Sequence, residues 1–207
     1  MKEPSKRNKL KTKEDFKDAV SRMLRTKGFP YIKNNKIAKE IEKDKRLLSH
    51  HFDGVNGLVK DFIKDKDYWS KLFENFNQPN LGSLELKDLF ISMMQENFEI
   101  FGRDEEMQSI IRWQISEENK VLKEISDQRE EAGAKLMALT DPIFKGTGIN
   151  FQCLMAIILG GSYYIILHSD KNKSVVCGVD IKREEDRNDF IRTIGQILDW
   201  AWSAAKS

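Results

Sequence analysis

Basic and hydrogen-bonding side chains are concentrated in one segment, NNKIAKEIEKDKRLLSHHF, which runs from residue 34 to residue 52. Lys45 and Arg46 open its second half, and cations of this kind donate hydrogen bonds to guanine O6 and N7 in the major groove of DNA. The candidate base- and phosphate-contacting residues of this half are Lys43, Lys45, Arg46, Ser49, His50 and His51. Of the two adjacent histidines, we expect one to face DNA and the other to face the core.

A second polar group stands at the start of this segment. Asn34, Asn35 and Lys36 stand before the first apolar residues of the segment. Side chains and N–H groups at such a helix start commonly contact phosphate. Each residue taken singly is equally well explained as an ordinary exposed side chain, so the patch as a whole carries the interpretation.

Catalytic and metal-binding chemistry has little support. Adjacent residues on a helix diverge by about 100°, so the neighbours His50 and His51 are poorly placed to bind one metal, and the third histidine is the distant His168. The motifs H-E-x-x-H, C-x-x-C and G-x-S-x-G do not occur. Cys153 and Cys177 do not make a disulfide framework. We expect no enzyme activity, no metal, no cofactor and a cytoplasmic protein.

Two short helices joined by a tight turn must position the polar residues. Apolar residues recur at helical spacing from residue 37 to residue 41, and Asp44 is a good N-cap for the second helix. We expect Leu47 and Leu48 to point inward and Phe52 to close this helix. The arrangement is that of a helix-turn-helix, which places its second helix in the major groove.

A third helix and a basic tail precede this pair. Thr12 with Asp15 resembles a capping box, an apolar face follows, and Gly28 ends the helix. Residues 1–11 form a tail rich in lysine and arginine. We expect this tail to be disordered alone, and either to follow DNA phosphates or a minor groove when DNA is present or to stay solvated.

At these residues the chain resembles the TetR/AcrR family of bacterial transcriptional regulators. The resemblance covers roughly residues 10–60 and rests on Ile37-Ala38, on the run LLSHHF that ends at residue 52, and on residues 54–58. The family usually has Gly, Tyr and Lys where this chain has Glu42, Ser49 and Val55, and in the family that Tyr and Lys contact DNA phosphates. The resemblance implies a C-terminal helical domain that binds a small molecule and dimerises through its last two long helices.

Composition and charge agree with two helical domains. The 207 residues are 40% hydrophobic and 33% charged and include only 4 prolines, which favours an all-α protein. Residues 1–60 hold 17 basic and 8 acidic residues, whereas residues 61–207 hold 18 and 25. Because such asymmetry suggests that one half meets a polyanion, we predict a three-helix helix-turn-helix DNA-binding domain over residues 1–60. Residues 61–207 then form a helical effector-binding and dimerisation domain.

Further helices are expected along the second domain. They cover residues 55–76, 83–101, 104–116, 119–139, 151–167 and 184–205. The first would be either a rigid lever shared by both domains or simply a long packed helix, and Ser83 would cap the second. The most apolar run, residues 151–167, is shorter than the roughly 20 residues of a membrane span, so we interpret it as a buried helix and expect no membrane partner. Its Gly160 and Gly161 predict the close approach of another backbone.

Methionine and aromatic residues of the middle helices are candidates for an effector pocket, because such side chains adapt to apolar ligands. They are Met93, Met94, Phe98, Met107, Trp113, Phe144 and Tyr163. Plain core packing is the competing interpretation, and the family resemblance is what favours the pocket.

The sequence therefore predicts an all-α, two-domain homodimer that binds a double-stranded DNA operator and dimerises through its last two helices. We expect a transcriptional regulator, and specifically a repressor that an unknown small-molecule effector releases from DNA. The alternative is a helical protein-interaction or adaptor module that has lost specific DNA binding. The departures from the family pattern at Glu42, Ser49 and Val55 keep this alternative open.

Overall fold

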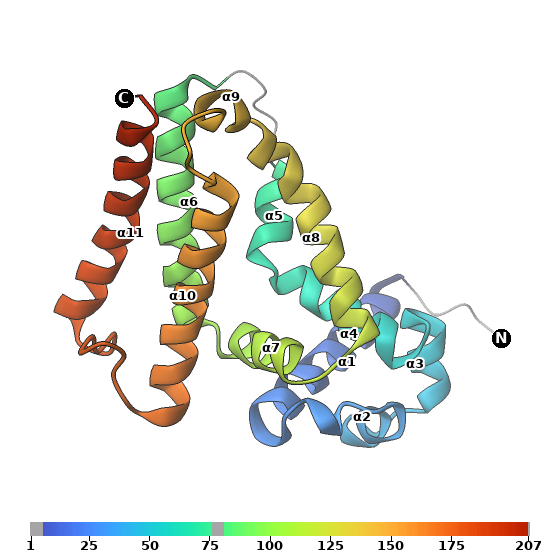
Figure 1. Ribbon diagram of the computed structural model, residues 1–207. Helices are drawn as coiled ribbons and strands as arrows, with labels where there is room; N and C mark the ends of the chain where they lie inside the picture. Colours follow the sequence, from blue (N-terminus) through green and yellow to red (C-terminus); the bar gives the residue numbers. More distant parts are fainter. Residues whose placement is uncertain (1–5, 76–80, 207) are drawn as a thin grey trace. The chain divides into compact units, whose positions relative to one another are not determined.

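The computed structural model describes residues 6–75 and 81–206, and these residues are mostly helical (Figure 1). They form eleven α-helices and one short 3-10 helix, and their only strand-like feature is an isolated bridge between Val176 and Val179. The all-α prediction is confirmed. Packing divides the chain into an N-terminal unit, Met1–Ser70 with Glu105–Gln128, and a C-terminal unit, Lys71–Asp104 with Arg129–Ser207.

The N-terminal unit differs in extent from the domain expected over residues 1–60. It includes α7 (Glu105–Ser116) and the first part of α8 (Lys120–Ala138). These residues are distant in sequence from the first 70, but α7 packs against α1, α4 and the 3-10 helix η1. A boundary drawn from motif and charge alone could not include a helix that returns to the unit later in the chain.

α1 (Lys6–Lys27) supplies one wall of the N-terminal unit. Its buried face consists of Phe16, Ala19, Val20, Met23 and Leu24, as its periodicity predicted. The helix begins at Lys6, earlier than the expected start at Thr12, because residues 6–11 contain no Gly or Pro to prevent it. This part of the basic tail is therefore helical, and the expectation of disorder was wrong for it; residues 1–5 lie outside the described residues. Gly28, with φ 77°, ends the helix as predicted.

Two short helices follow, where the sequence predicted them. After η1 (Phe29–Tyr31), α2 covers Asn34–Glu40 and α3 covers Lys45–Phe52, with a tight turn between them (Figure 1). Glu42 in that turn has φ 52°, a left-handed conformation in which a side chain costs about 1 kcal/mol. The turn thus keeps a glycine-like backbone although glycine is absent.

The long helix expected over residues 55–76 is divided into α4 (Gly54–Lys66) and α5 (Tyr68–Asn75). Asp67, between them, is buried and has an extended ψ of 113°. Its carboxylate accepts a hydrogen bond from the Ser70 hydroxyl at 2.6 Å. Aspartate competes for helix backbone groups in this way and favours helix starts. The prediction of one continuous helix over this segment is therefore wrong.

α7 is fixed to the N-terminal unit by polar and aromatic contacts. Glu106 is buried and accepts a hydrogen bond from the Ser21 hydroxyl of α1. The Lys66 ammonium of α4 lies 2.5 Å from the same carboxylate. About two turns further along α7, the Trp113 ring stacks on Phe29 of η1, with ring centroids 3.7 Å apart. These contacts hold α1, α4 and α7 together behind α2 and α3.

The C-terminal unit is built on α6 (Ser83–Arg103), which lies between α10 (Phe151–Asn172) and α11 (Glu184–Ala204) in Figure 1. The N-cap of α6 is Gly82 rather than the expected Ser83, because the Glu85 carboxylate accepts the Gly82 N–H at 2.8 Å. The sequence predicts no helix between the one that ends at residue 76 and the one that begins at residue 83, and most of this interval falls on residues 76–80, which lie outside the described residues. α9 (Asp141–Phe144) precedes the loop to α10.

α10 is only partly buried, which corrects the expectation of a fully buried helix. Among the described residues it is the one helix long and apolar enough to cross a membrane by length and composition, and 33% of its most apolar window is buried. One side packs on α6, whereas Ile157 and Tyr164 are 71% and 58% exposed. No atom lies within 4 Å of a Cβ built on Gly160 or Gly161, so no backbone within the described chain approaches them.

Candidate nucleic-acid interface

α3 has an apolar back and a polar front. Its start is fixed by Asp44, whose carboxylate accepts the Arg46 N–H at 2.8 Å, as the sequence predicted. Leu48 is completely buried and Phe52 is 7% exposed. Leu47 is 37% exposed, so the expectation that it points inward was wrong. Successive helix positions diverge by about 100°, and only one of the two leucines can face the core of so short a helix.

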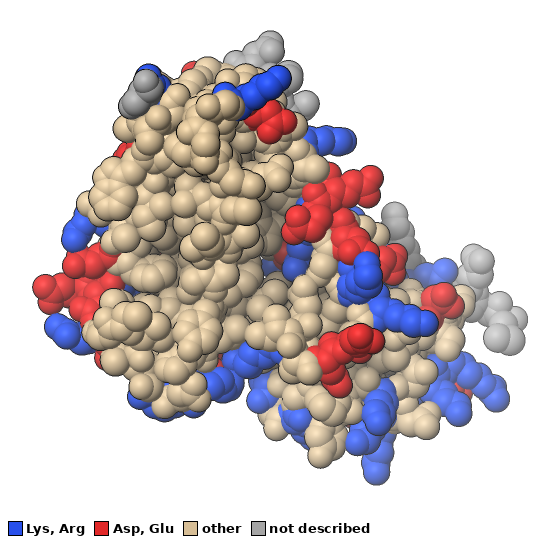
Figure 2. Space-filling view, viewed as in Figure 1, with Lys and Arg blue, Asp and Glu red and all other residues tan. Residues whose placement is uncertain are grey.

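The front of α3 carries four of the predicted residues. Lys45, Arg46, Ser49 and His50 are all exposed. Within the described part of the chain, Lys45 and Arg46 have no ion-pair partner. Figure 2 shows lysine and arginine side chains gathered on the part of the N-terminal unit that holds α2 and α3. Two adjacent cations at the first turn of an exposed helix are free to donate to an anion or a base edge.

Lys43 and His51, the remaining two predicted residues of this segment, are only partly exposed. The Lys43 ammonium lies 2.5 Å from the Asp15 carboxylate, so it already has a partner. His51 is half-buried, and the centroid of its ring lies 5.1 Å from the centroid of the His50 ring. Burial, and then the charges of His50, Lys13, Lys9 and Lys43, lower the pKa of His51.

The residues at the start of α2 have three different roles. The Asn34 side-chain oxygen accepts the Val55 N–H at 2.9 Å, and so joins the start of α2 to the start of α4. Lys36 lies over the Tyr31 ring at 4.1 Å from its centroid, which leaves an exposed cation held against an aromatic face. Asn35 is simply exposed. Of the three predicted phosphate contacts, Asn34 thus has a structural role in the free protein.

Two cations of α1 lie beside α3, and the sequence did not predict this position for either of them. The Lys13 ammonium of α1 lies 5.0 Å from the centroid of the Phe52 ring, and Lys9 is one helical turn earlier on α1. The available signal was their spacing of four residues, which puts both on one helix face if the helix starts before Thr12. Because residues 1–11, which include Lys9, were expected to be disordered, the four-residue spacing between Lys9 and Lys13 was not used.

The predicted effector residues do not form one group. Met107 and Trp113 belong to the N-terminal unit, and the other five belong to the C-terminal unit. Phe98 stacks on Phe190 at 4.9 Å, and Phe144 stacks on Phe151 at 4.5 Å. Met93 and Met94 are buried, and Tyr163 packs against Phe101 with ring centroids 4.2 Å apart. These contacts favour the competing interpretation, in which the residues are plain core.

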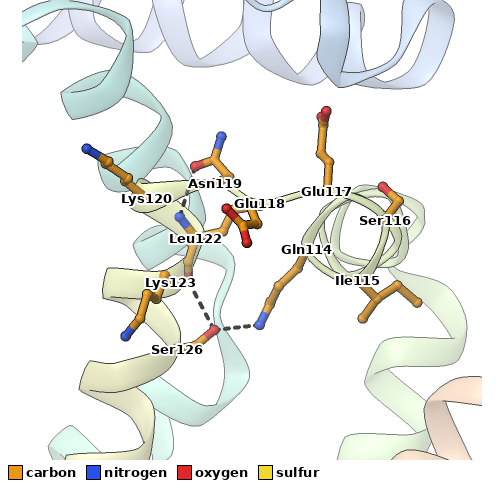
Figure 3. A pocket seen from close by; sticks show the side chains of 10 residues that line it. All are labelled: Gln114, Ile115, Ser116, Glu117, Glu118, Asn119, Lys120, Leu122, Lys123 and Ser126. Carbon is orange, nitrogen blue, oxygen red and sulfur yellow. Dashed lines mark hydrogen bonds between the residues drawn. The ribbon is translucent and has the colours of Figure 1, made fainter.

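A pocket in the N-terminal unit lies at the turn between α7 and α8 (Figure 3). Its volume is about 900 Å³, and it is lined mostly by polar residues from Gln114 to Ser126. Gln114 donates to the Ser126 hydroxyl at 2.5 Å, and Asn119 accepts the Val121 N–H at 2.9 Å. These polar groups stabilise the turn itself. None of the seven predicted effector residues lines this pocket.

Metal-binding side chains are scattered. In residues 6–75 and 81–206, no group of three or more His, Cys, Asp or Glu side chains could hold a metal ion. His168, far from the other histidines, shares a hydrogen bond of 3.0 Å with Asn172. Cys153 and Cys177 are exposed free thiols.

Comparisons with family models, with curated proteins and with solved structures find no match to this chain. The resemblance to TetR/AcrR regulators therefore stays a prediction that rests on the residues quoted above. The geometry of α3 and its surroundings is the independent basis for a functional proposal.

Proposed function

We propose that this protein is a DNA-binding transcriptional regulator that reads duplex DNA with α3. The observation that carries the proposal is the two-sided character of this helix: Leu48 fixes its back in the core, while Lys45 and Arg46 are exposed and unpaired at its first turn within the described chain. A basic front on a helix held rigidly from behind is what major-groove recognition requires.

The dimensions and charge of the helix support this role. α3 has 8 residues and is therefore about 12 Å long, a length suited to reading a few base pairs. A B-DNA major groove is about 12 Å wide and admits one α-helix. The exposed Lys36 on α2 and the exposed Asn35 beside it add groups for the phosphate backbone. The charge of residues 1–60, with 17 basic and 8 acidic residues, agrees with a polyanionic partner.

We propose further that two copies bind DNA together. A helix of 8 residues reads only a short half-site, and two-fold symmetry doubles the contacts. α10 offers an apolar face for this purpose, because Ile157 and Tyr164 are exposed. Apart from the nearby backbone of α10 itself, no atom of the described residues lies within 4 Å of a Cβ built on Gly160 or Gly161. A second copy of the same face would provide the close backbone approach that two helical glycines favour. Control of DNA binding by a small molecule stays a prediction of the family resemblance.

Selection of fragments from the source organism's own DNA tests the proposal. We expect the protein to enrich a small set of sequences with two related half-sites, and its affinity to fall steeply as salt rises. Charge reversal at Lys45 and Arg46 should abolish selective binding, whereas the same change at Lys145 and Lys182, which are exposed in the C-terminal unit, should not. Binding that is equal for all sequences, or capture of an acidic protein but no duplex, would instead favour the adaptor function.

A further inference from the structure

The first turns of α1 lie beside the end of α3. The Lys13 ammonium sits over the ring of Phe52, the last residue of α3, at 5.0 Å from its centroid. Phe16, one turn further along α1, meets the same ring edge-on at 6.0 Å. Lys9 precedes Lys13 by four residues and is exposed on the same face of α1. Two cations of α1 therefore flank the proposed reading helix.

The half-buried His51 adjoins Phe52, whose ring lies under the Lys13 ammonium, and the centroid of its own ring lies 5.1 Å from that of His50. The charged and titratable groups that act on it are Lys9 and Lys13 from α1, Lys43 from the turn before α3, and His50 from α3 itself. Asp15, an acidic residue of α1, is paired with Lys43. The surroundings of His51 are thus strongly positive in the free protein, and they oppose a further positive charge.

DNA in the proposed position would change this balance. An α-helix with its side chains is about 10–12 Å across and fills a major groove of about 12 Å, so groups at the flank of α3 meet the phosphates at the groove edge. We propose that Lys9 and Lys13 of α1 form a second set of phosphate contacts beside the reading helix, and that His51 takes up a proton when DNA binds.

This inference rests on the proposed function and adds two properties to it. The first is a set of phosphate contacts on α1 from Lys9 and Lys13, beside a helix whose exposed Ser49 carries no charge. Burial first, and then the nearby positive charges, lower the pKa of His51 in the free protein, and proton uptake follows because phosphates offset the second of these causes. Operator binding therefore becomes stronger as the pH falls through the pKa that His51 has in the complex, by up to about tenfold in affinity per pH unit for one proton.

The phosphate contacts are tested by the salt dependence of binding to a duplex recovered in the selection described above. Changing Lys9→Gln together with Lys13→Gln should reduce the slope of log K against log salt by about 0.9 for each lost contact. Lys13→Arg, which keeps the positive charge, should have the wild-type slope, whereas the single variant Lys13→Gln should have a reduced one. Lys11→Gln is the matched control, since Lys11 is exposed on the same part of α1 but points about 160–200° away from Lys9 and Lys13. An unchanged slope in the double variant overturns this part of the inference.

Proton uptake is measured directly by titration calorimetry in two buffers of different ionisation enthalpy. We expect wild-type protein to take up protons on binding the duplex near pH 6.5, the usual pKa of histidine, and His51→Gln to take up fewer. His168→Gln, which changes a histidine of α10, should behave as wild type. No uptake by wild type, or equal uptake by His51→Gln, overturns the role of His51.

Different outcomes would contradict the proposed function and this further inference. If the duplex binds and depends on Lys45 and Arg46 but not on α1 or on pH, only this inference is wrong. If no duplex is selected, the proposed function fails, and the inference fails with it.

Discussion

The Lys66 ammonium of α4 lies 2.5 Å from a carboxylate oxygen of Glu106 on α7, and this contact joins two helices of the N-terminal unit that are distant in sequence. The other oxygen of Glu106 accepts from the Ser21 hydroxyl of α1, and Arg25 approaches it at 3.5 Å. A carboxylate buried at 7% exposure thus receives donors from α1 and α4. The support of α3 includes a helix that lies outside the first 70 residues.

Glu106→Gln should destabilise the protein measurably. The substitution keeps the size of the side chain but removes the charge that Lys66 and Arg25 neutralise. Hydrogen bonds to charged groups contribute about 1.5–3 kcal/mol, and the partial exposure of both cations places the expected loss near the lower end. Chemical denaturation measures it. Glu105→Gln, on the exposed neighbour, is the control and should change the free energy of unfolding by less than about 0.5 kcal/mol.

The same carboxylate predicts a pH dependence. Burial raises the pKa of Glu106, but hydrogen bonds from Lys66 and Ser21 and the charges of Lys66 and Arg25 outweigh it, so the pKa lies below the usual 4.5. The stabilisation is therefore complete above the unfolded value and is lost as the pH falls through the lowered folded value. We expect the difference in unfolding free energy between wild type and Glu106→Gln to shrink below about pH 4.5. A difference that stays constant down to about pH 3 contradicts this assignment.

Leucine truncation tests the orientation of α3. Leu48 is fully buried, so Leu48→Ala removes core contacts and leaves a cavity, at an expected cost of about 3 kcal/mol. Leu47 is 37% exposed, so Leu47→Ala should cost less than about 1 kcal/mol. Urea denaturation of the two variants, which differ by one position, measures the contrast. Equal losses would mean that α3 is rotated from the orientation in which Lys45 and Arg46 are presented.

The turn between α2 and α3 contains removable strain. Glu42 has φ 52°, and glycine adopts this conformation without the roughly 1–2 kcal/mol cost of a side chain. Glycine also increases the entropy of the unfolded chain, so we expect Glu42→Gly to raise the free energy of unfolding by no more than about 1 kcal/mol. Glu14→Gly, in the regular helix α1, loses the same side chain and should lower stability by about 1 kcal/mol. Opposite signs in thermal melts are the expected result.

Local patterns were enough to predict the helices around the candidate site. The apolar spacing of α1, the Asp44 cap and the burial of Leu48 follow from residues within a few positions of one another. Gly28 likewise ends α1 because of its own backbone freedom. Each of these features is decided within one or two helical turns, which is the range over which sequence periodicity is informative.

Features decided by distant residues could not be predicted in this way. Asn34 looked like a phosphate contact, but its oxygen accepts the Val55 N–H, 21 positions later. The break at Asp67 depends on burial of that aspartate as well as on its bond to Ser70. Lys13 is a candidate phosphate contact because α1 begins at Lys6 and places the Lys13 ammonium over the Phe52 ring. Tertiary contacts determine all three.

The exposed face of α10 leads to a last prediction, on assembly. In a two-fold dimer both copies contribute the same residues to the interface. Ile157→Glu would therefore bring two like charges into an apolar contact. We expect this variant to be monomeric and to lose operator affinity, because each monomer then binds one half-site. Ile115→Glu is the matched control, since Ile115 is a 74% exposed isoleucine of α7, and it should leave the mass unchanged. Sedimentation equilibrium measures the mass. A monomeric wild type, or a dimer that survives Ile157→Glu, would show that this face is not the interface, and the glycines at positions 160 and 161 would then require another explanation.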